Sequence, residues 1–346
     1  MAIIIVTGAI GHLGNVLVRK LERTEHEIRG LDLSGGRTIS FQRARMYYGD
    51  VRDYNSLEPL FDNPNRQDIY VIHCAGIVSI VSKFQQKVYD VNVRGTKNII
   101  DLCLVNHVKK LIYVSSSHAI PEQEGGKVMR EVSVFSPEWV EGLYAKTKAE
   151  ASQLVLDNCQ NGLNACVVHP SGLIGPEDFG HAHLTQMIQD YLNGRLTAYV
   201  DGGYDFVDVR DVADGILSCL QKGRSGECYL LTNRYCTVKE LLDCLHQITG
   251  RREIHTKLPM WFAKAAAPMA EAYYKLLHQP PLYTSYSLYT LLSNGNFTHE
   301  KADRELSYQV RPMAQTLKDT AEWLAEQGRI KGKYVQRNAM AFKKRR

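Results

Sequence analysis

A phenol and an ammonium group stand four positions apart in the chain, at Tyr144 and Lys148. The surrounding pattern predicts a helix over residues 143–158, and residues four apart share one face of a helix, so the two side chains would be neighbours. A phenol has an ordinary pKa of about 10, and a nearby positive charge lowers that pKa. The spacing therefore predicts proton transfer by Tyr144, with Lys148 lowering the pKa of the phenol.

Three consecutive serines, Ser115 to Ser117, follow an apolar run that predicts a strand over residues 110–115. Open parallel sheets bind ligands at the carboxyl ends of their strands, so these hydroxyls are expected at a ligand-binding edge. Taken alone, the spacing of Tyr144 and Lys148 is typical of a solvated helix face. Its position after this strand and after a glycine-rich loop favours a catalytic role.

The glycine-rich loop joins a first predicted strand, residues 2–7, to a helix predicted over residues 11–23. Its pattern is T-G-x-x-G-x-x-G. The first two glycines allow a tight turn and the close approach of a pyrophosphate, and the third lets the helix pack closely on the strand. The start of the helix offers unpaired N–H groups and the positive end of a dipole. The predicted cofactor-binding residues here are Gly8, Gly11, His12, Leu13 and Gly14.

An acidic residue, Asp32, lies near the end of the second predicted strand, residues 27–33. A carboxylate at this place accepts hydrogen bonds from the adenosine ribose and repels a 2′-phosphate, which favours NAD over NADP. Arg37 keeps NADP open as the alternative, because it could hold that phosphate. Asp50 and Val51 follow the next short strand and could lie near the adenine, although an aspartate there is equally typical of a turn or a helix cap.

Strand-like apolar runs alternate with helical patterns along the first half of the chain. Near-continuous Ile, Val and Leu in the strands indicates burial on both faces, as in a parallel sheet covered by helices. The sequence therefore predicts an α/β fold, a doubly wound parallel sheet (Rossmann) with a smaller, interleaved, mostly helical C-terminal substrate lobe. The other elements predicted in this part are helices over 54–61 and 87–106 and strands over 69–75 and 165–169.

A cluster of prolines and glycines at residues 170–176 breaks this pattern and marks the start of a second lobe. Further on, residues 204–209, 211–221 and 227–232 again predict strand, helix and strand, so the chain is expected to return to the first sheet. The predicted division is a dinucleotide-binding domain of residues 1–170, rejoined by 204–232, a substrate-binding lobe of 171–203 and 233–330, and a basic tail of 331–346.

Together these motifs resemble the extended short-chain dehydrogenase/reductase superfamily, of the NAD-dependent epimerase/dehydratase type, over residues 2–330. The resemblance implies reversible hydride transfer with NAD or NADP. It also implies that Tyr144 exchanges a proton with the substrate oxygen, that Ser117 hydrogen-bonds this oxygen, and that Lys148 holds the nicotinamide ribose. Segments 73–76, 91–96 and 169–176 supply three more cofactor-side candidates, Ala75, Asn92 and Pro170. For Asn92, a helix asparagine whose amide is satisfied by the protein is the alternative.

Within the superfamily, segments 71–78, 88–99 and 111–117 resemble the branch of 3β-hydroxysteroid dehydrogenases and dihydroflavonol reductases. Sugar-nucleotide members often contain R-x-x-N-x-x-G-P, whereas residues 169–176 read HPSGLIGP. The favoured function is therefore oxidation or reduction of a hydrophobic, steroid-like or flavonoid-like secondary alcohol or ketone. A sugar-nucleotide epimerase or dehydratase is the alternative, since Arg210 could compensate, and a non-catalytic dinucleotide-binding protein is the third.

Aromatic residues of the second lobe could line an apolar substrate pocket, although core packing is the more common role for each of them. His118, next to Ser117, is expected in the pocket wall rather than in catalysis. The spacing of His and Met residues predicts no metal site. The aromatic candidates are Trp261, Phe262, Tyr273, Tyr274, Tyr283, Tyr286 and Tyr289.

The composition, 44% hydrophobic and 23% charged over 346 residues, is that of a globular protein and excludes disordered, collagen-like and coiled-coil classes. The net charge of +5 comes from residues 329–346, which hold eight Lys or Arg, and the remainder sums to −3. Nucleic-acid binding is therefore not predicted, while contact of the tail with an anionic surface stays open.

Eight cysteines without a CxxC pair predict reduced thiols and a cytoplasmic location. Met1 directly precedes the first predicted strand, so no secretory signal is expected. Charges, prolines and hydroxyl groups interrupt the apolar stretches 258–277 and 276–299, which predicts no membrane span and leaves peripheral contact open. A homodimer formed through helices 87–106 and 143–158 is a further open expectation.

Overall fold

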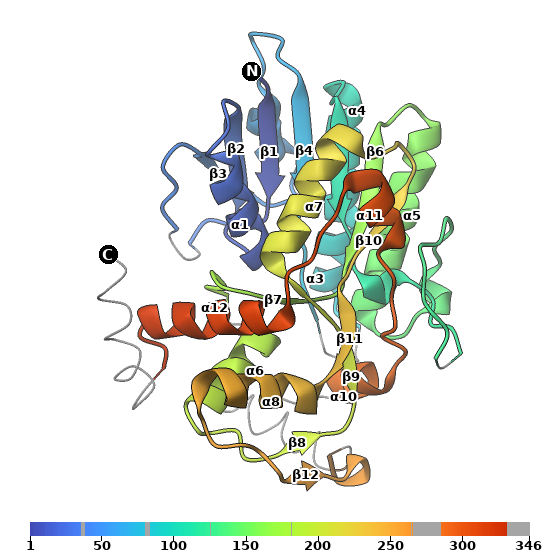
Figure 1. Ribbon diagram of the computed structural model, residues 1–346. Helices are drawn as coiled ribbons and strands as arrows, with labels where there is room; N and C mark the ends of the chain where they lie inside the picture. Colours follow the sequence, from blue (N-terminus) through green and yellow to red (C-terminus); the bar gives the residue numbers. More distant parts are fainter. Residues whose placement is uncertain are drawn as a thin grey trace.

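A seven-stranded parallel sheet forms the centre of the computed structural model (Figure 1). The structure describes residues 1–35, 39–79, 84–124, 126–180, 182–263, 265 and 285–330. In spatial order the strands are β10 (Cys228–Leu231), β6 (Ala165–Pro170), β5 (Lys110–Val114), β4 (Ile69–His73), β1 (Ile3–Thr7), β2 (Glu27–Asp32) and β3 (Arg45–Tyr48). The chain leaves β1 towards β2 and β3 and later towards β4, so the strand order reverses between β1 and β4, where such sheets bind nucleotides.

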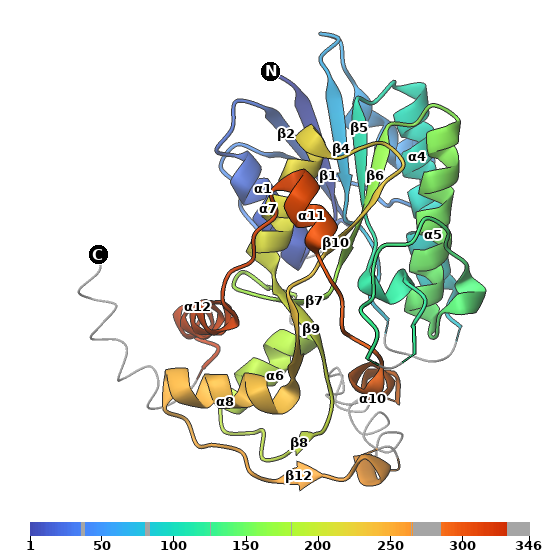
Figure 2. The same cartoon turned by 45° about the vertical axis from the view of Figure 1, so that its right-hand side comes forward.

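Side chains of the strands alternate between two buried layers, as the period of two requires. In β1, Ile3 and Ile5 pack into one apolar cluster, and Ile4 and Val6 pack into the other. The first layer is covered by α4 (Gly95–Val105) and α5 (Leu143–Gln160). The second is covered by α1 (His12–Leu21), α7 (Val209–Lys222) and α11 (Glu300–Leu306), so the sheet is doubly wound as predicted (Figure 2).

Two of the predicted helices are divided in the structure. The predicted helix 54–61 consists of α2 (Tyr54–Leu57) and a 3₁₀ turn (Glu58–Phe61), because Pro59 has no N–H with which to continue the α-helical bonding. The predicted helix 87–106 runs as α3 (Gln86–Tyr89), a π-helical turn (Asp90–Arg94) and α4. Such π-helical turns are frequent at functional sites, and this one contains Asn92.

Two small sheets lie beyond the carboxyl ends of the large one. The first joins β7 (Gly172–Ile174), β9 (Gly203–Asp208) and β11 (Arg234–Thr237), and the second pairs β8 (Tyr199–Val200) with β12 (Lys257–Leu258). The helices of this part are α6 (His183–Leu192), α8 (Val238–Thr249), α10 (Ser285–Leu292) and α12 (Met313–Glu326).

The return of residues 204–232 to the large sheet occurs only in part. Helix α7 and strand β10 belong to it, as expected, but β9 pairs with β7 in parallel and with β11 in antiparallel orientation. The expectation for residues 204–209 is therefore wrong, because β9 is already hydrogen-bonded on both sides within the small sheet. The division of the chain into domains stays a prediction.

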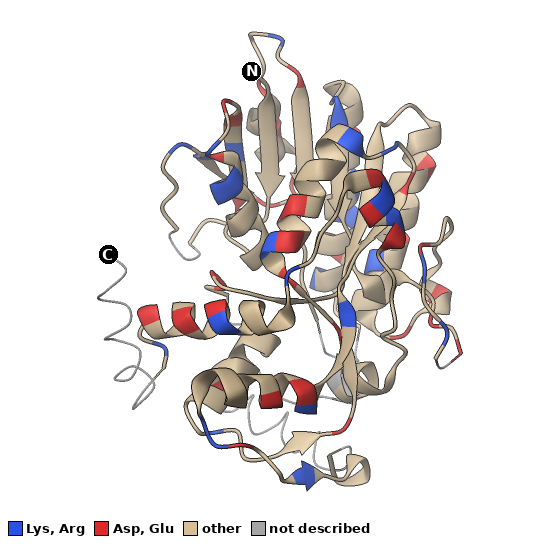
Figure 3. Ribbon diagram, in the orientation of Figure 1, with Lys and Arg blue, Asp and Glu red and all other residues tan. Residues whose placement is uncertain are grey.

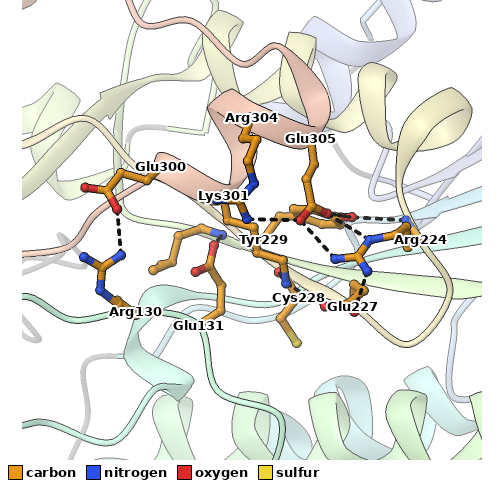
Figure 4. A network of polar contacts seen from close by, with 11 residues as sticks. Arg130, Glu131, Arg224, Glu227, Cys228, Tyr229, Glu300, Lys301, Arg304 and Glu305 are labelled. Carbon is orange, nitrogen blue, oxygen red and sulfur yellow. Dashed lines mark hydrogen bonds and ion pairs between the residues drawn. The ribbon is translucent and has the colours of Figure 1, made fainter.

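A network of charged residues covers β10, the edge strand of the large sheet (Figure 4). The carboxylate of Glu131 accepts a hydrogen bond from the backbone N–H of Leu230 at 2.9 Å. From α11, where acidic and basic residues interleave (Figure 3), Lys301 donates to Glu227 at 2.6 Å and to the carbonyl of Cys228 at 2.8 Å. These contacts satisfy backbone groups that an open edge would present to another chain.

All eight cysteine side chains are free. Five of them are buried, and burial raises the pKa of each of these thiols, so they behave as small apolar groups of the core. In the described part of the chain, no helix has both the length and the apolar character that crossing a membrane demands.

His73, the last residue of β4, is completely buried between two threonines. Its Nδ1 lies 2.6 Å from the hydroxyl oxygen of Thr7, and its Nε2 lies 3.1 Å from that of Thr96. Thr7 accepts from the N–H of Ala75 and can donate to Nδ1, whereas Thr96 donates to the carbonyl of Asn92 and can accept from Nε2–H. Both ring nitrogens of the neutral imidazole thus have a hydrogen-bond partner. Burial, reinforced by the positive charge of Lys148, lowers the pKa of His73 to about 3.

Acid should therefore destabilise the fold through His73. The pKa of His73 in the folded state lies below its unfolded value of about 6.5. The stability contributed by the buried neutral imidazole is therefore complete above pH ~6.5 and is lost as the pH falls towards 3. At pH 5 the loss amounts to about 2 kcal/mol from this residue. Thermal unfolding of His73→Gln should depend less on pH between 7 and 5 than that of the wild type. His255→Gln, which changes an exposed histidine, is the control, and an unchanged pH dependence in His73→Gln would contradict the assignment.

Candidate active site

The carboxyl ends of β1, β4, β5 and β6 meet at one edge of the large sheet. The parallel register aligns Thr7 with His73 across β1 and β4, His73 with Tyr113 across β4 and β5, and Val114 with Val168 across β5 and β6. The glycine loop follows β1 and the three serines follow β5, while Asp32 ends the neighbouring strand β2, and Tyr144 and Lys148 lie on α5, which packs beside β6. The sheet therefore positions the candidate site.

The glycine loop after β1 has the geometry of a dinucleotide cradle. Gly8 has a left-handed backbone with φ of 68°, and a Cβ atom there would lie 2.9 Å from the backbone nitrogen of Ala75. A Cβ atom on Gly14 would collide with the carbonyl oxygen of Gly8. No side chain caps the first turn of α1, which begins after Gly11. The three glycines thus bring the start of the helix against β1 and β4, and the space that they leave fits a pyrophosphate.

Asp32 lies at the end of β2 beside this loop. Its Oδ2 accepts a hydrogen bond from the N–H of Ile10 at 2.8 Å, and its Oδ1 accepts from the N–H of Leu33 at 2.9 Å. The carboxylate therefore helps to hold the loop at the place where an adenosine ribose would lie. Arg37, on which the NADP alternative depends, lies outside the described residues.

Two loop residues predicted near the cofactor have protein partners of their own. The imidazole Nε2 of His12 lies 2.9 Å from the carbonyl oxygen of Pro176, so this side chain ties α1 to the loop after β7. The Asp50 carboxylate forms an ion pair with Arg52 at 2.6 Å and accepts from its backbone N–H, and these contacts lower the pKa of Asp50. Asp50 thus has the turn role that the sequence also suggested, and contact with an adenine stays a prediction.

The remaining cofactor-side candidates lie around the same edge, mostly in structural roles. Leu13 and Val51 are buried, and Pro170 ends β6. Ala75 follows β4 and donates its N–H to Thr7 at 3.1 Å. Asn92 bonds both backbone groups of Ile77 and donates to Thr147 at 3.0 Å, so its amide is satisfied by the protein. Asn92 therefore clamps the loop after β4 to α5.

Tyr144 and Lys148 both lie on α5, the helix that the sequence predicts, and both are buried there. Lys148 donates to the carbonyl oxygen of Val114 at 2.7 Å, and its Nζ lies 4.8 Å from the centre of the Tyr113 ring. Burial lowers the pKa of Lys148 to about 8.

The expected lowering of the Tyr144 pKa by Lys148 is wrong in direction. Burial raises the pKa of this phenol, and the opposing contribution comes from a hydrogen bond with Ser116. The reason is geometric, because Lys148 directs its ammonium group to the end of β5. The phenol of Tyr144 consequently keeps its proton at neutral pH.

The three serines after β5 have three different surroundings. Ser115 pairs with Ser152 at 2.7 Å inside the contact between β5 and α5. The side chain of Ser116 forms a hydrogen bond with the Tyr144 phenol. The carbonyl oxygen of Ser116 lies 2.9 Å from Nδ1 of His169. Ser117, the predicted catalytic hydroxyl, lies 3.2 Å from the phenolic oxygen of Tyr204.

A cavity opens beside Ser117 and His118, between the end of β5 and the loops around α10. Tyr289 is the member of the predicted aromatic set that lines it, while Trp261 and Phe262 are exposed. Tyr273, Tyr274 and Tyr283 lie outside the described residues, as does the side chain of Tyr286. The described lining residues are Ser117, His118, Ile120, Glu122, Met129, Trp139, Val140, Glu141, Tyr204, Tyr289, Ser293, Asn294 and Phe297.

Several residues of this cavity were not predicted from the sequence. Tyr204, the second residue of β9, contacts Ser117 across 87 positions of the chain. Glu122 accepts hydrogen bonds from Tyr289 at 3.1 Å and from the N–H of Asn294 at 2.7 Å. No local pattern marks these residues, because each acts through a partner far away in the sequence. Among the described residues, no group of three or more His, Cys, Asp or Glu could hold a metal ion.

Comparison with known proteins agrees with this geometry. Sterol demethylase protein B of Methylococcus capsulatus is 30% identical over 337 residues, covering 94% of this chain and 99% of that protein. A putative dihydroflavonol 4-reductase of Synechocystis is 27% identical over 332 residues, covering 94% and 95%. The crystal structure of gox2253 matches with a TM-score of 0.82 and 29% identity over 96% of this chain and 100% of that one.

The model of the NAD dependent epimerase/dehydratase family matches residues 4–231, which span the glycine loop, the serines after β5 and the Tyr144–Lys148 pair. The resemblance inferred from the motifs is thereby confirmed. The chain belongs to the NAD-dependent epimerase/dehydratase family, and NAD is its cofactor.

Proposed function

We propose that this protein is an NAD-dependent oxidoreductase that interconverts a secondary alcohol and a ketone on an uncharged, largely apolar molecule. The observation that carries the proposal is the cavity beside Ser117. Its described lining combines Met129, Trp139 and Phe297 with two carboxylates, Glu122 and Glu141, and with neither Lys nor Arg. Such a lining suits a hydrophobic ring system with a few polar substituents.

The same lining disfavours the alternative, a sugar-nucleotide epimerase or dehydratase. A nucleoside diphosphate brings two negative charges, which the two carboxylates would repel. Arg210, the residue that could have compensated, forms ion pairs with Asp208 and Asp319 at 2.7 Å each. Arg311 is likewise paired with Asp208 and with Asp211 at 3.0 Å. Both guanidinium groups therefore stabilise the fold around β9 and α12.

In the proposed reaction the cofactor transfers the hydride, and side chains of the protein transfer the proton and bind the substrate oxygen. NAD, when bound in the glycine cradle, supplies the acceptor or donor of a hydride. Tyr144 donates its proton to the substrate oxygen during reduction and takes one from it during oxidation. Ser117 hydrogen-bonds the same oxygen. Lys148, whose ammonium group lies at the end of β5, would hold the nicotinamide ribose.

A non-catalytic dinucleotide-binding protein has weaker support. Such a protein has no need to bury Tyr144 and Lys148 beside Ser117, because a buried ammonium group costs free energy. We also propose that the protein works in a reducing compartment such as the cytoplasm, since its eight thiols are free. A homodimer through α4 and α5 stays a prediction.

The assay that tests the function mixes the purified protein with NAD and a panel of 3β-hydroxysteroids, bile acids and other apolar secondary alcohols. Reduced nicotinamide should accumulate, as followed by its absorbance. Conversion of UDP-sugars without net change in nicotinamide absorbance, together with inactivity on the whole panel, would establish the sugar-nucleotide alternative instead.

The variant Tyr144→Phe should lose about 100-fold or more in kcat, because it cannot transfer a proton. Its affinity for NAD should stay within a few-fold of the wild-type value, since the ring remains. In the wild type the rate of alcohol oxidation should rise with pH, because burial raises the pKa of Tyr144 and oxidation requires the phenolate. Tyr191→Phe, which removes a phenol from α6, is the control. A kcat within twofold of wild type in Tyr144→Phe would remove Tyr144 from the mechanism.

The variant Asp32→Asn should bind NAD about 10- to 100-fold more weakly, because a charged acceptor for the ribose hydroxyls is replaced by a neutral one. It should also discriminate less against NADP, while its amide oxygen can still accept from Ile10. Titration calorimetry with both nucleotides measures the two dissociation constants. Asp68→Asn, at the opposite end of the sheet before β4, is the control. An unchanged ratio of the two constants would place the Asp32 carboxylate away from the ribose.

A further inference from the structure

Ser117 belongs to a chain of polar contacts with Tyr204 and His118. Its hydroxyl oxygen lies 3.2 Å from the phenolic oxygen of Tyr204, which in turn lies 3.3 Å from Nδ1 of His118. Ser117 and His118 come from the turn after β5 in the large sheet, and Tyr204 comes from β9 in the small sheet. The chain of contacts therefore joins the two sheets in the wall of the cavity.

The position of the Tyr204 ring is fixed by close packing on several sides. The ring is 4% exposed and stacks on the His118 imidazole, with centres 5.0 Å apart and planes 12° apart. Phe297 meets it edge-on at 5.7 Å. Gly295 approaches so closely that a Cβ atom there would lie 2.9 Å from Cδ2 of Tyr204. The phenolic oxygen is thus held at one place relative to Ser117.

His118 links this chain to the proton donor. Its ring lies edge-on to Tyr144, with centres 6.3 Å apart. Burial lowers the pKa of His118 to about 4, so the imidazole is neutral at neutral pH and Nδ1 accepts or donates according to the tautomer. The hydroxyl groups of Ser117 and Tyr204 can each donate one hydrogen bond and accept others. The donor and acceptor roles along these hydrogen bonds can therefore be reversed without a change of charge on any of the three side chains.

We propose that Tyr204 is a positioning residue that, together with His118, orients the hydroxyl of Ser117 towards the reacting oxygen of the substrate. The inference rests on the proposed function and adds a residue to it. When Tyr204 donates to His118 and accepts from Ser117, the Ser117 oxygen offers its lone pairs to the hydroxyl of an alcohol. When His118 donates to Tyr204 and Tyr204 donates to Ser117, the Ser117 proton points to the oxygen of a ketone. The same arrangement of Ser117, Tyr204 and His118 thus serves both the alcohol and the ketone form of the substrate.

The variant Tyr204→Phe tests this role because it keeps the ring and all its packing and removes only the hydroxyl. We expect kcat to fall about 5- to 10-fold, the loss of one hydrogen bond, with KM, NAD affinity and the unfolding temperature close to wild type. Gly295→Ala keeps the hydroxyl but displaces the ring, and it should lower kcat in the same way. Tyr235→Phe, which removes a phenol from the neighbouring strand β11, is the control.

A double-mutant cycle with Ser117→Ala decides whether Tyr204 acts through Ser117. We expect Tyr204→Phe to have no further effect on kcat once the Ser117 hydroxyl is absent. An equal loss of kcat in both backgrounds, or a loss that appears in KM or in the unfolding temperature instead, would overturn the inference. The cycle is run with whichever substrate the wild type converts, an apolar alcohol or a UDP-sugar. Failure of the proposed function is recognised separately, by the wild-type substrate and by full activity of Tyr144→Phe.

Discussion

The parallel register of β1, β4, β5 and β6 is the constraint on which the rest of the site depends. It brings Thr7, His73 and Tyr113 to one level of the sheet, and the glycine loop and the loop after β4 start from there. Gly8 and Gly14 allow α1 to approach β1 and β4 within backbone contact, so the cradle of the glycine loop is built from main chain.

The fold and the tight geometry of the glycine loop could be predicted from the sequence, because both depend on local patterns. The spacing of Gly8, Gly11 and Gly14, and that of Tyr144 and Lys148, report directly on a turn and on one face of a helix. The strand over residues 204–209 was also predicted correctly as a strand. Its partners were not, since an apolar β-pattern does not reveal which of two sheets will accept it.

The residues that line the cavity beside Ser117 could not be predicted, because their contacts join parts of the chain that are remote in sequence. Tyr204, Glu122 and Asn294 meet their partners across 87 or more positions, and their roles follow from the docking of the two sheets. The pKa of Tyr144 was also misjudged. A neighbouring charge can be inferred from helical spacing, but neither the depth of burial nor the direction in which Lys148 points is written in that spacing.

Burial of Lys148 places opposing demands on the site. Its ammonium group is charged only below its pKa, and burial lowers that pKa to about 8, only slightly above neutral pH. The carbonyl of Val114 and the face of the Tyr113 ring offset part of that cost without supplying a countercharge. A carboxylate in their place would hold the proton on Lys148 more firmly but would cancel its positive charge. The neutral partners therefore leave a buried cation at the carboxyl end of β5 whose charge is not cancelled.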